Sequence, residues 1–162
     1  GFAIKQFNTI KAAKKEVSIL DDVKDSPFFP NVLIRVSNIV VREYVQGENL
    51  YEYIQKKGLS YSLSKEIIDL LEDLKRLKFK RLNVRNAHIF IDSNEKIKVI
   101  DPRKPYVKNT PYPKDIIKLL LKLKVFDKFL QDLLNYRPDL LDYWIDGYNY
   151  VANNYRHVLR YW

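Results

Sequence analysis

A β-hairpin pattern, with a polar loop before it and one carboxylate after it, constrains the fold of this chain most. Ile89 to Ile91 and Ile97 to Ile100 are short strand-like runs, and the turn-forming residues 92–96 separate them. The loop 81–88 leads into the first run, and Asp101 follows the second. The stretch therefore predicts a hairpin that a polar loop enters and a carboxylate leaves.

Strand and helix patterns surround this hairpin. Apolar residues recur at helical spacing over residues 9–23, where Thr9 or Asn8 is able to cap the helix. An apolar face also marks residues 65–78 as a core helix. Strands are predicted over residues 2–7, 32–36 and 39–44, and further helices after Gly47, over 116–134 and from Leu140 onward.

Length and charge bound the possible functions. The 162 residues are enough for one domain with a sizeable core. The net charge of +9 favours phosphate-bearing partners, whether nucleotide, acidic protein, nucleic acid or membrane surface. The sequence has no cysteine, which excludes disulfides and thiolate metal sites. Charged residues interrupt the most apolar stretch, 116–134, so we expect a buried helix, no membrane span and a cytoplasmic protein.

The residue order around the hairpin resembles the catalytic loop, hairpin and metal-binding aspartate of the protein kinase superfamily, H-R-D-L-x-x-x-N and then D-F-G. With the first strands aligned, Arg81-Leu-Asn83 stands at H-R-D and His88 at the asparagine. Asp101-Pro-Arg103 stands at D-F-G. The chain is thus similar to a small, atypical or degenerate member of the serine/threonine-kinase-like type.

Segments nearer the N-terminus extend this resemblance. Phe2-Ala-Ile-Lys5 is similar to the V-A-I-K strand, and Glu16 lies on the next helix like the glutamate that holds the strand lysine. The stretch Glu43-Tyr-Val-Gln-Gly-Glu-Asn-Leu50 is similar to the hinge and following helix, which commonly read E-Y-V-x-G-x-x-L.

The resemblance implies an α+β fold of the protein-kinase-like, two-lobe kind. Residues 1–45 would form a small lobe of antiparallel strands plus one helix, and residues 46–162 a mainly helical large lobe. No glycine-rich G-x-G-x-x-G loop precedes Lys5 in the sequence. We therefore expect the small lobe to be incomplete, either because the chain is a fragment or because the lobe lacks a lid over the phosphates.

The resemblance also assigns roles at an ATP site. Lys5 would neutralise the phosphates, and Glu16 would position Lys5. Asp101, together with His88, would bind Mg²⁺ or Mn²⁺. The imidazole of His88 suits Mn²⁺ better than Mg²⁺. The backbone of the hinge would hold adenine, and the residues assigned there are Glu43, Tyr44, Val45 and Asn49.

Asn83 stands where kinases carry the carboxylate that accepts or orients the substrate hydroxyl. An amide can orient a hydroxyl by hydrogen bonding, but it cannot take its proton at neutral pH. Loss of general-base help typically lowers a rate by about 10²–10⁴-fold. Asn83 therefore predicts reduced phosphate transfer.

Some side chains have two readings from the sequence alone. Glu16 could instead be an exposed glutamate that pairs with Lys11 or Lys15 on its own helix. Arg42 lies just before the hinge, where a guanidinium would contact a phosphate or an acid, or obstruct the adenine pocket. Asp115 would cap the backbone of the polar loop, as in kinases, or be an ordinary helix N-terminal residue.

Three functions follow. The first is a serine/threonine-kinase-like phosphotransferase that uses ATP and Mg²⁺ on an unidentified protein substrate, with reduced or atypical activity. The second is a pseudokinase that serves as a nucleotide-binding or protein-interaction scaffold. The third and weakest is a basic nucleic-acid-binding domain, whose binding would weaken steeply with salt.

Overall fold

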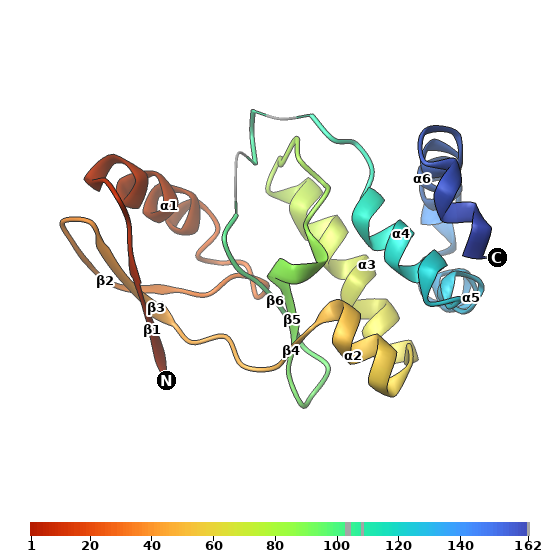
Figure 1. Ribbon diagram of the computed structural model, residues 1–162, viewed down its shortest axis with the longest axis horizontal. Coiled ribbons are helices and arrows are strands. Elements are labelled where there is room, and N and C mark those ends of the chain that lie inside the picture. Colours follow the sequence, from red (N-terminus) through yellow and green to blue (C-terminus); the bar gives the residue numbers. More distant parts are fainter. Residues whose placement is uncertain (103–104, 108, 162) are drawn as a thin grey trace.

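The computed structural model describes residues 1–102, 105–107 and 109–161. The expected α+β class is confirmed: the described residues form two small antiparallel sheets and six α-helices (Figure 1). The elements are β1 (Phe2–Gln6), α1 (Ile10–Asp22), β2 (Val32–Val36), β3 (Ile39–Glu43), β4 (Glu48–Asn49), α2 (Leu50–Lys57), α3 (Tyr61–Arg76), β5 (Ile89–Ile91), β6 (Ile97–Val99), α4 (Lys114–Lys122), α5 (Phe126–Tyr136) and α6 (Leu141–Asn154), with 3₁₀ turns at Asn86–His88, Pro138–Leu140 and Arg156–Tyr161.

The first sheet, sheet A, has the strand order β1-β3-β2, and α1 packs on one of its faces. Thr9 caps α1 as predicted, because its side chain accepts a hydrogen bond from the Ala12 N–H. Ala13 and Val17 of α1 pack on Val40 of β3. The other face of the sheet leaves several large apolar side chains exposed, namely Phe2, Ile4, Ile34 and Val36.

The second sheet, sheet B, contains the predicted hairpin. Strands β5 and β6 pair antiparallel, and the short strand β4 pairs with the other edge of β5. Asp92 closes the turn by accepting hydrogen bonds from the N–H groups of Asn94 and Lys96. Four strand side chains, Ile89, Ile91, Ile97 and Val99, are buried in the main core. The core thus holds the hairpin, and with it the polar loop and Asp101.

Helix α3 is the central helix of the core, as predicted, but it begins earlier than the apolar pattern indicated. Its buried face includes Leu63, Ile67 and Leu71. The predicted start at residue 65 was wrong, because the Ser60 side chain accepts a hydrogen bond from the Leu63 N–H and caps the helix one turn upstream.

The single buried helix predicted over residues 116–134 was also wrong. The segment forms two helices, α4 and α5, which separate at Lys124. Lys124 has a φ of +58°, and the Val125 N–H bonds back to the Leu120 carbonyl. This backbone arrangement ends α4 at its C-terminus, although apolar residues continue at helical spacing beyond Lys124.

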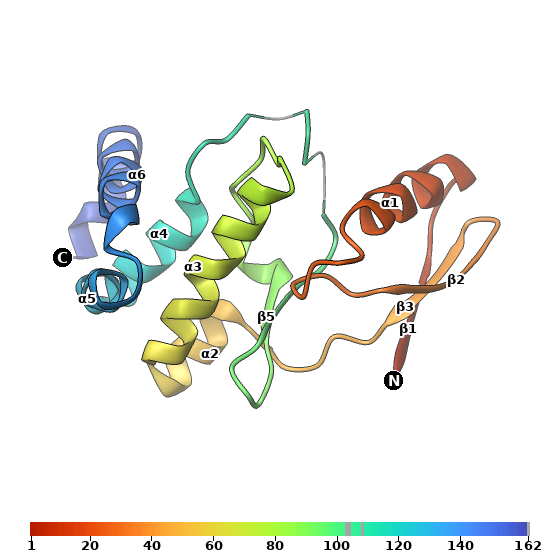
Figure 2. The same ribbon diagram turned by 180° about the vertical axis from the view of Figure 1, so that it is seen from behind.

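Two views agree on the arrangement of these elements (Figures 1 and 2). Sheet A and α1 lie at the end of the molecule that holds the N-terminus, sheet B and α3 lie in the middle, and α5 and α6 lie at the opposite end. The chain crosses from β3 to β4 as an extended segment. Over the described residues, no helix is both long enough and apolar enough to cross a membrane.

Candidate functional site

Three charged side chains from three separate elements meet between sheet A and the hairpin. Lys5 Nζ of β1 lies 2.8 Å from Glu16 Oε2 of α1 and 2.6 Å from Asp101 Oδ1, just after β6. All three are partly shielded, with side-chain exposures of 30%, 12% and 22%. Glu16 therefore pairs with Lys5, not with Lys11 or Lys15 as its alternative reading held.

The surroundings keep Asp101 ionised. Burial acts to raise the pKa of its carboxyl, but the hydrogen bond and charge of Lys5, together with Arg42 and His88, lower that pKa below its usual value. Asp101 also has a φ of +52°, a backbone conformation that favours residues with short polar side chains. The ionised Asp101 carboxylate therefore lies in direct contact with the Lys5 ammonium.

Glu16 has one carboxylate oxygen to spare. Its Oε2 atom bonds to Lys5, whereas Oε1 is buried and has no hydrogen-bond partner in the described part of the chain. A buried anionic oxygen without a partner costs free energy, so it favours a further donor at this place.

Arg42 is the unexpected member of the site. The β1–β3 register pairs Ala3 with Arg42 and Lys5 with Val40, so Arg42 and Lys5 share the face of sheet A that carries α1. The residue is only 9% exposed, and its charge acts on Asp101. Of its two readings from the sequence, contact with an acid is the one that agrees with this electrostatic interaction.

The extended segment after β3 leaves backbone groups available. The N–H and C=O of Val45 have no hydrogen-bond partner among the described residues. The Tyr44 N–H donates to the Gly1 carbonyl at 3.2 Å, and the Tyr44 side chain is exposed. A hollow of about 220 Å³ opens where the segment passes the hairpin, lined by Pro30, Glu43, Tyr44, Val45, Gln46, Asp92, Lys96 and Lys98.

Side chains at both ends of this segment serve the fold. The Glu43 carboxylate accepts hydrogen bonds from the Asn31 N–H and side-chain amide at 3.0 and 3.1 Å, and the backbone bond from Asn31 is the main reason that its pKa is lowered. Asn49 caps α2 by accepting a hydrogen bond from the Glu52 N–H. The Glu43 and Asn49 side chains are thus engaged within the fold, whereas the backbone of Val45 and the exposed Tyr44 side chain are open to a ligand.

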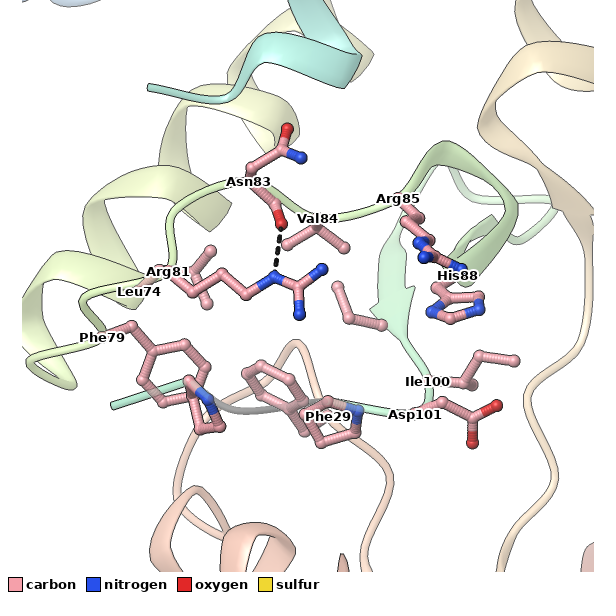
Figure 3. A pocket seen from close by; sticks show the side chains of 13 residues that line it. Phe29, Leu74, Phe79, Arg81, Asn83, Val84, Arg85, His88, Ile100 and Asp101 are labelled. Atoms are coloured by element: carbon pink, nitrogen blue, oxygen red, sulfur yellow. Dashed lines mark hydrogen bonds between the residues drawn. The ribbon is translucent and has the colours of Figure 1, made fainter. Parts of the chain in front are cut away.

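A pocket beside the ion cluster is lined by the polar loop (Figure 3). Phe29 and Phe79 form part of its apolar wall, and the Arg81 side chain extends into it. Arg81 Nε donates to the Asn83 carbonyl at 3.4 Å. Asp101 lies at the edge of the pocket, with its carboxylate directed away from Arg81. Arg103, the last residue of the D-F-G counterpart, lies outside the described residues.

The Asn83 side chain points away from this pocket and is only 6% exposed (Figure 3). Its Nδ2 donates to Asp115 Oδ2 at 3.0 Å, and its Oδ1 accepts from the Asp115 N–H at 2.8 Å. Both ends of the amide are thus engaged by the first turn of α4. The Asn86 side chain also donates to the Asp115 carbonyl at 3.0 Å. Asp115 therefore contacts the polar loop through the side chains of Asn83 and Asn86 and not through the loop backbone, and it also lies in the first turn of α4.

The donor set near Asp101 fits a metal only in part. In the described ranges, no group of three or more His, Asp or Glu side chains is placed to hold a metal ion. His88 lies close enough to influence the Asp101 carboxylate electrostatically. Mg²⁺ commonly takes only one or two protein carboxylates when the oxygens of a substrate phosphate complete its shell. Asp101 thus suits a metal that arrives with a phosphate ligand.

Comparison with known proteins identifies no family for this chain. A scan against protein-family models finds no match, and a search of curated proteins finds none either.

Proposed function

We propose that this chain is a protein-kinase-like domain that binds a purine nucleoside triphosphate between sheet A and the hairpin, and transfers its terminal phosphate at a reduced rate. One observation carries the proposal: Lys5 bridges Glu16 and Asp101, although 96 positions separate Lys5 from Asp101. A cation held by a helix glutamate beside a second, ionised carboxylate is the arrangement that phosphoryl transfer uses to neutralise phosphates.

The roles follow from the geometry. Lys5 would exchange its bond to Asp101 for one to a phosphate oxygen, while Glu16 keeps the lysine in place. Asp101 would then hold a phosphate-borne Mg²⁺ or Mn²⁺, an ion that supplies neutralisation of developing charge. The unpaired backbone groups of Val45 would contact the edge of the base. The two-lobe fold is part of this proposal.

The reduced rate rests on the position of Asn83. Its amide is engaged by Asp115 and cannot accept a proton, so the acceptor hydroxyl would lack a base. The same observation favours a second function, a pseudokinase scaffold that binds nucleotide without transferring phosphate. Phosphate transfer to any acceptor separates the two functions, because both include nucleotide binding.

Calorimetry and thermal unfolding with ATP and with GTP, each with and without Mg²⁺ or Mn²⁺, test the proposal. ATP at about 100 times its dissociation constant should stabilise the fold by about 2.7 kcal/mol, or roughly 5–10 °C for a chain of this size. Lys5→Ala and Asp101→Asn should abolish the metal-dependent shift. Lys14→Ala, which removes an exposed lysine of α1 outside the site, should preserve it.

Two results would contradict the proposal. The first is the absence of any nucleotide-dependent shift in the wild-type chain. The second is an equal shift in Lys5→Ala, because the nucleotide would then bind somewhere else. If nucleotide binds as proposed, the release of labelled phosphate or its transfer to a mixed protein acceptor distinguishes the phosphotransferase from the scaffold.

A further inference from the structure

Arg42 lies near the end of β3, between the extended segment and the ion cluster. Its neighbour on one side is the extended segment with the free backbone of Val45, and on the other side the ion cluster at Lys5 and Asp101. A ligand that spans from this segment to Lys5 must pass over the guanidinium, because Arg42 and Lys5 share one face of sheet A.

Most N–H donors of the Arg42 guanidinium make no hydrogen bond to the described residues. Its Nη1 donates to the Glu43 carbonyl at 3.4 Å, which is long for a hydrogen bond, and no other hydrogen bond from this guanidinium occurs within the described residues. The nearby Asp101 carboxylate is already held by Lys5 at 2.6 Å. A guanidinium carries five N–H donors and no acceptor, and no nitrogen of Arg42 is both fully enclosed and without a partner. The remaining donors of this mostly buried side chain are therefore open to an acceptor group on a ligand.

Resting on the nucleotide-binding function proposed above, we propose that Arg42 determines base specificity and selects guanine over adenine. Guanine presents two acceptors on one edge, O6 and N7, which an arginine fork engages together. Adenine presents an amino group in place of O6, so that two donors would face each other in a nearly buried site. The mismatch leaves polar groups unpaired, which is the strongest source of discrimination between similar ligands.

The expected preference is measurable. A good bidentate contact between arginine and guanine discriminates against the wrong base by roughly 5-fold to 150-fold in affinity. Inosine triphosphate keeps O6 and N7 but lacks the 2-amino group of guanine. It should therefore bind like GTP if Arg42 reads O6, and like ATP if another group reads the 2-amino group.

Calorimetric titrations with GTP, ITP and ATP, each with Mg²⁺, test this inference on the wild-type chain, on Arg42→Met and on the control Arg35→Met. Arg35 is a comparable arginine on β2, but it is 68% exposed and pairs with Asp21 on the surface. The inference predicts that GTP and ITP bind more tightly than ATP to the wild-type chain and to Arg35→Met. In Arg42→Met the preference should disappear or reverse.

Each result has a definite meaning. Equal affinities for GTP and ATP, or tighter ATP binding, in the wild-type chain would overturn the inference about Arg42 and leave the nucleotide-binding proposal standing. Failure of all three nucleotides to bind would overturn both. If Arg42→Met does not fold, the comparison of three nucleotides on the wild-type chain still tests the inference, because equal or tighter binding of ATP overturns it.

Discussion

Replacing Asn83 by aspartate would place a carboxylate in the polar loop. The structure predicts that this substitution destabilises the loop and does not activate it. The substitution exchanges the Nδ2 donor, 3.0 Å from Asp115 Oδ2, for a second carboxylate oxygen at a residue that is 6% exposed. At that separation and an effective dielectric constant of 20, two unit charges repel by about 5 kcal/mol.

Protonation limits this penalty. A carboxyl with a reference pKa of about 3.9 takes up a proton at pH 7 for about 4 kcal/mol, and the protonated group then donates to its neighbour again. We therefore expect Asn83→Asp to lower the free energy of unfolding by about 3–4 kcal/mol at pH 7. The loss should shrink to about 1–2 kcal/mol at pH 5, because the folded pair binds a proton more readily than the unfolded chain.

The matched control is the exchange Asn83→Asp with Asp115→Asn. It restores one amide donor opposite one carboxylate, so its stability should return to within about 1 kcal/mol of the wild type. Urea unfolding followed by tryptophan fluorescence, for the wild type, both single variants and the exchange, gives the coupling energy. The reasoning is refuted if Asn83→Asp is as stable as the wild type at pH 7, or if the exchange is no more stable than that single variant.

Two further predictions concern the scaffold of the site. Gly47→Ala should lower the free energy of unfolding by about 3 kcal/mol or more, because an added Cβ would lie 2.0 Å from the Ile91 carbonyl oxygen at a φ of +113°. Gly58→Ala, with open space at a φ of +77°, should cost only about 1–2 kcal/mol, and equal losses in urea unfolding would contradict the clash. Ser64→Ala should cost about 1.5–3 kcal/mol, because the buried Ser64 hydroxyl donates to Asp132 at 2.6 Å. Unchanged unfolding of that variant would mean that the Lys128 ammonium, 2.7 Å from Asp132 Oδ2, satisfies the carboxylate alone.

The elements that carry the site could be predicted from the sequence because their signals are local. Apolar alternation and turn residues identified the hairpin before Asp101, and helical spacing identified the helix that carries Glu16. The errors also have local causes. A serine cap at Ser60 outweighed the apolar pattern at the start of α3, and a positive φ at Lys124 divided an otherwise continuous apolar run.

The long-range partners could not be predicted from pattern alone. The hydrogen bonds between Asn83 and Asp115 join residues 32 positions apart, and nothing in the spacing of either residue specifies that both ends of the amide are used. The burial of Arg42 likewise depends on its register opposite Ala3 and on the position of Asp101. The place of Arg42 just before the hinge-like stretch that begins at Glu43 is the one signal that pointed to it.

The contact between Lys5 and Asp101 also has a mechanical consequence. It joins the first strand of sheet A to the end of the hairpin, in addition to other contacts such as the Val99 N–H bond to the Phe28 carbonyl. Any ligand that draws Lys5 away releases this contact and leaves the others in place. Occupancy of the site is therefore coupled to one of the contacts that join the N-terminal sheet to the rest of the molecule.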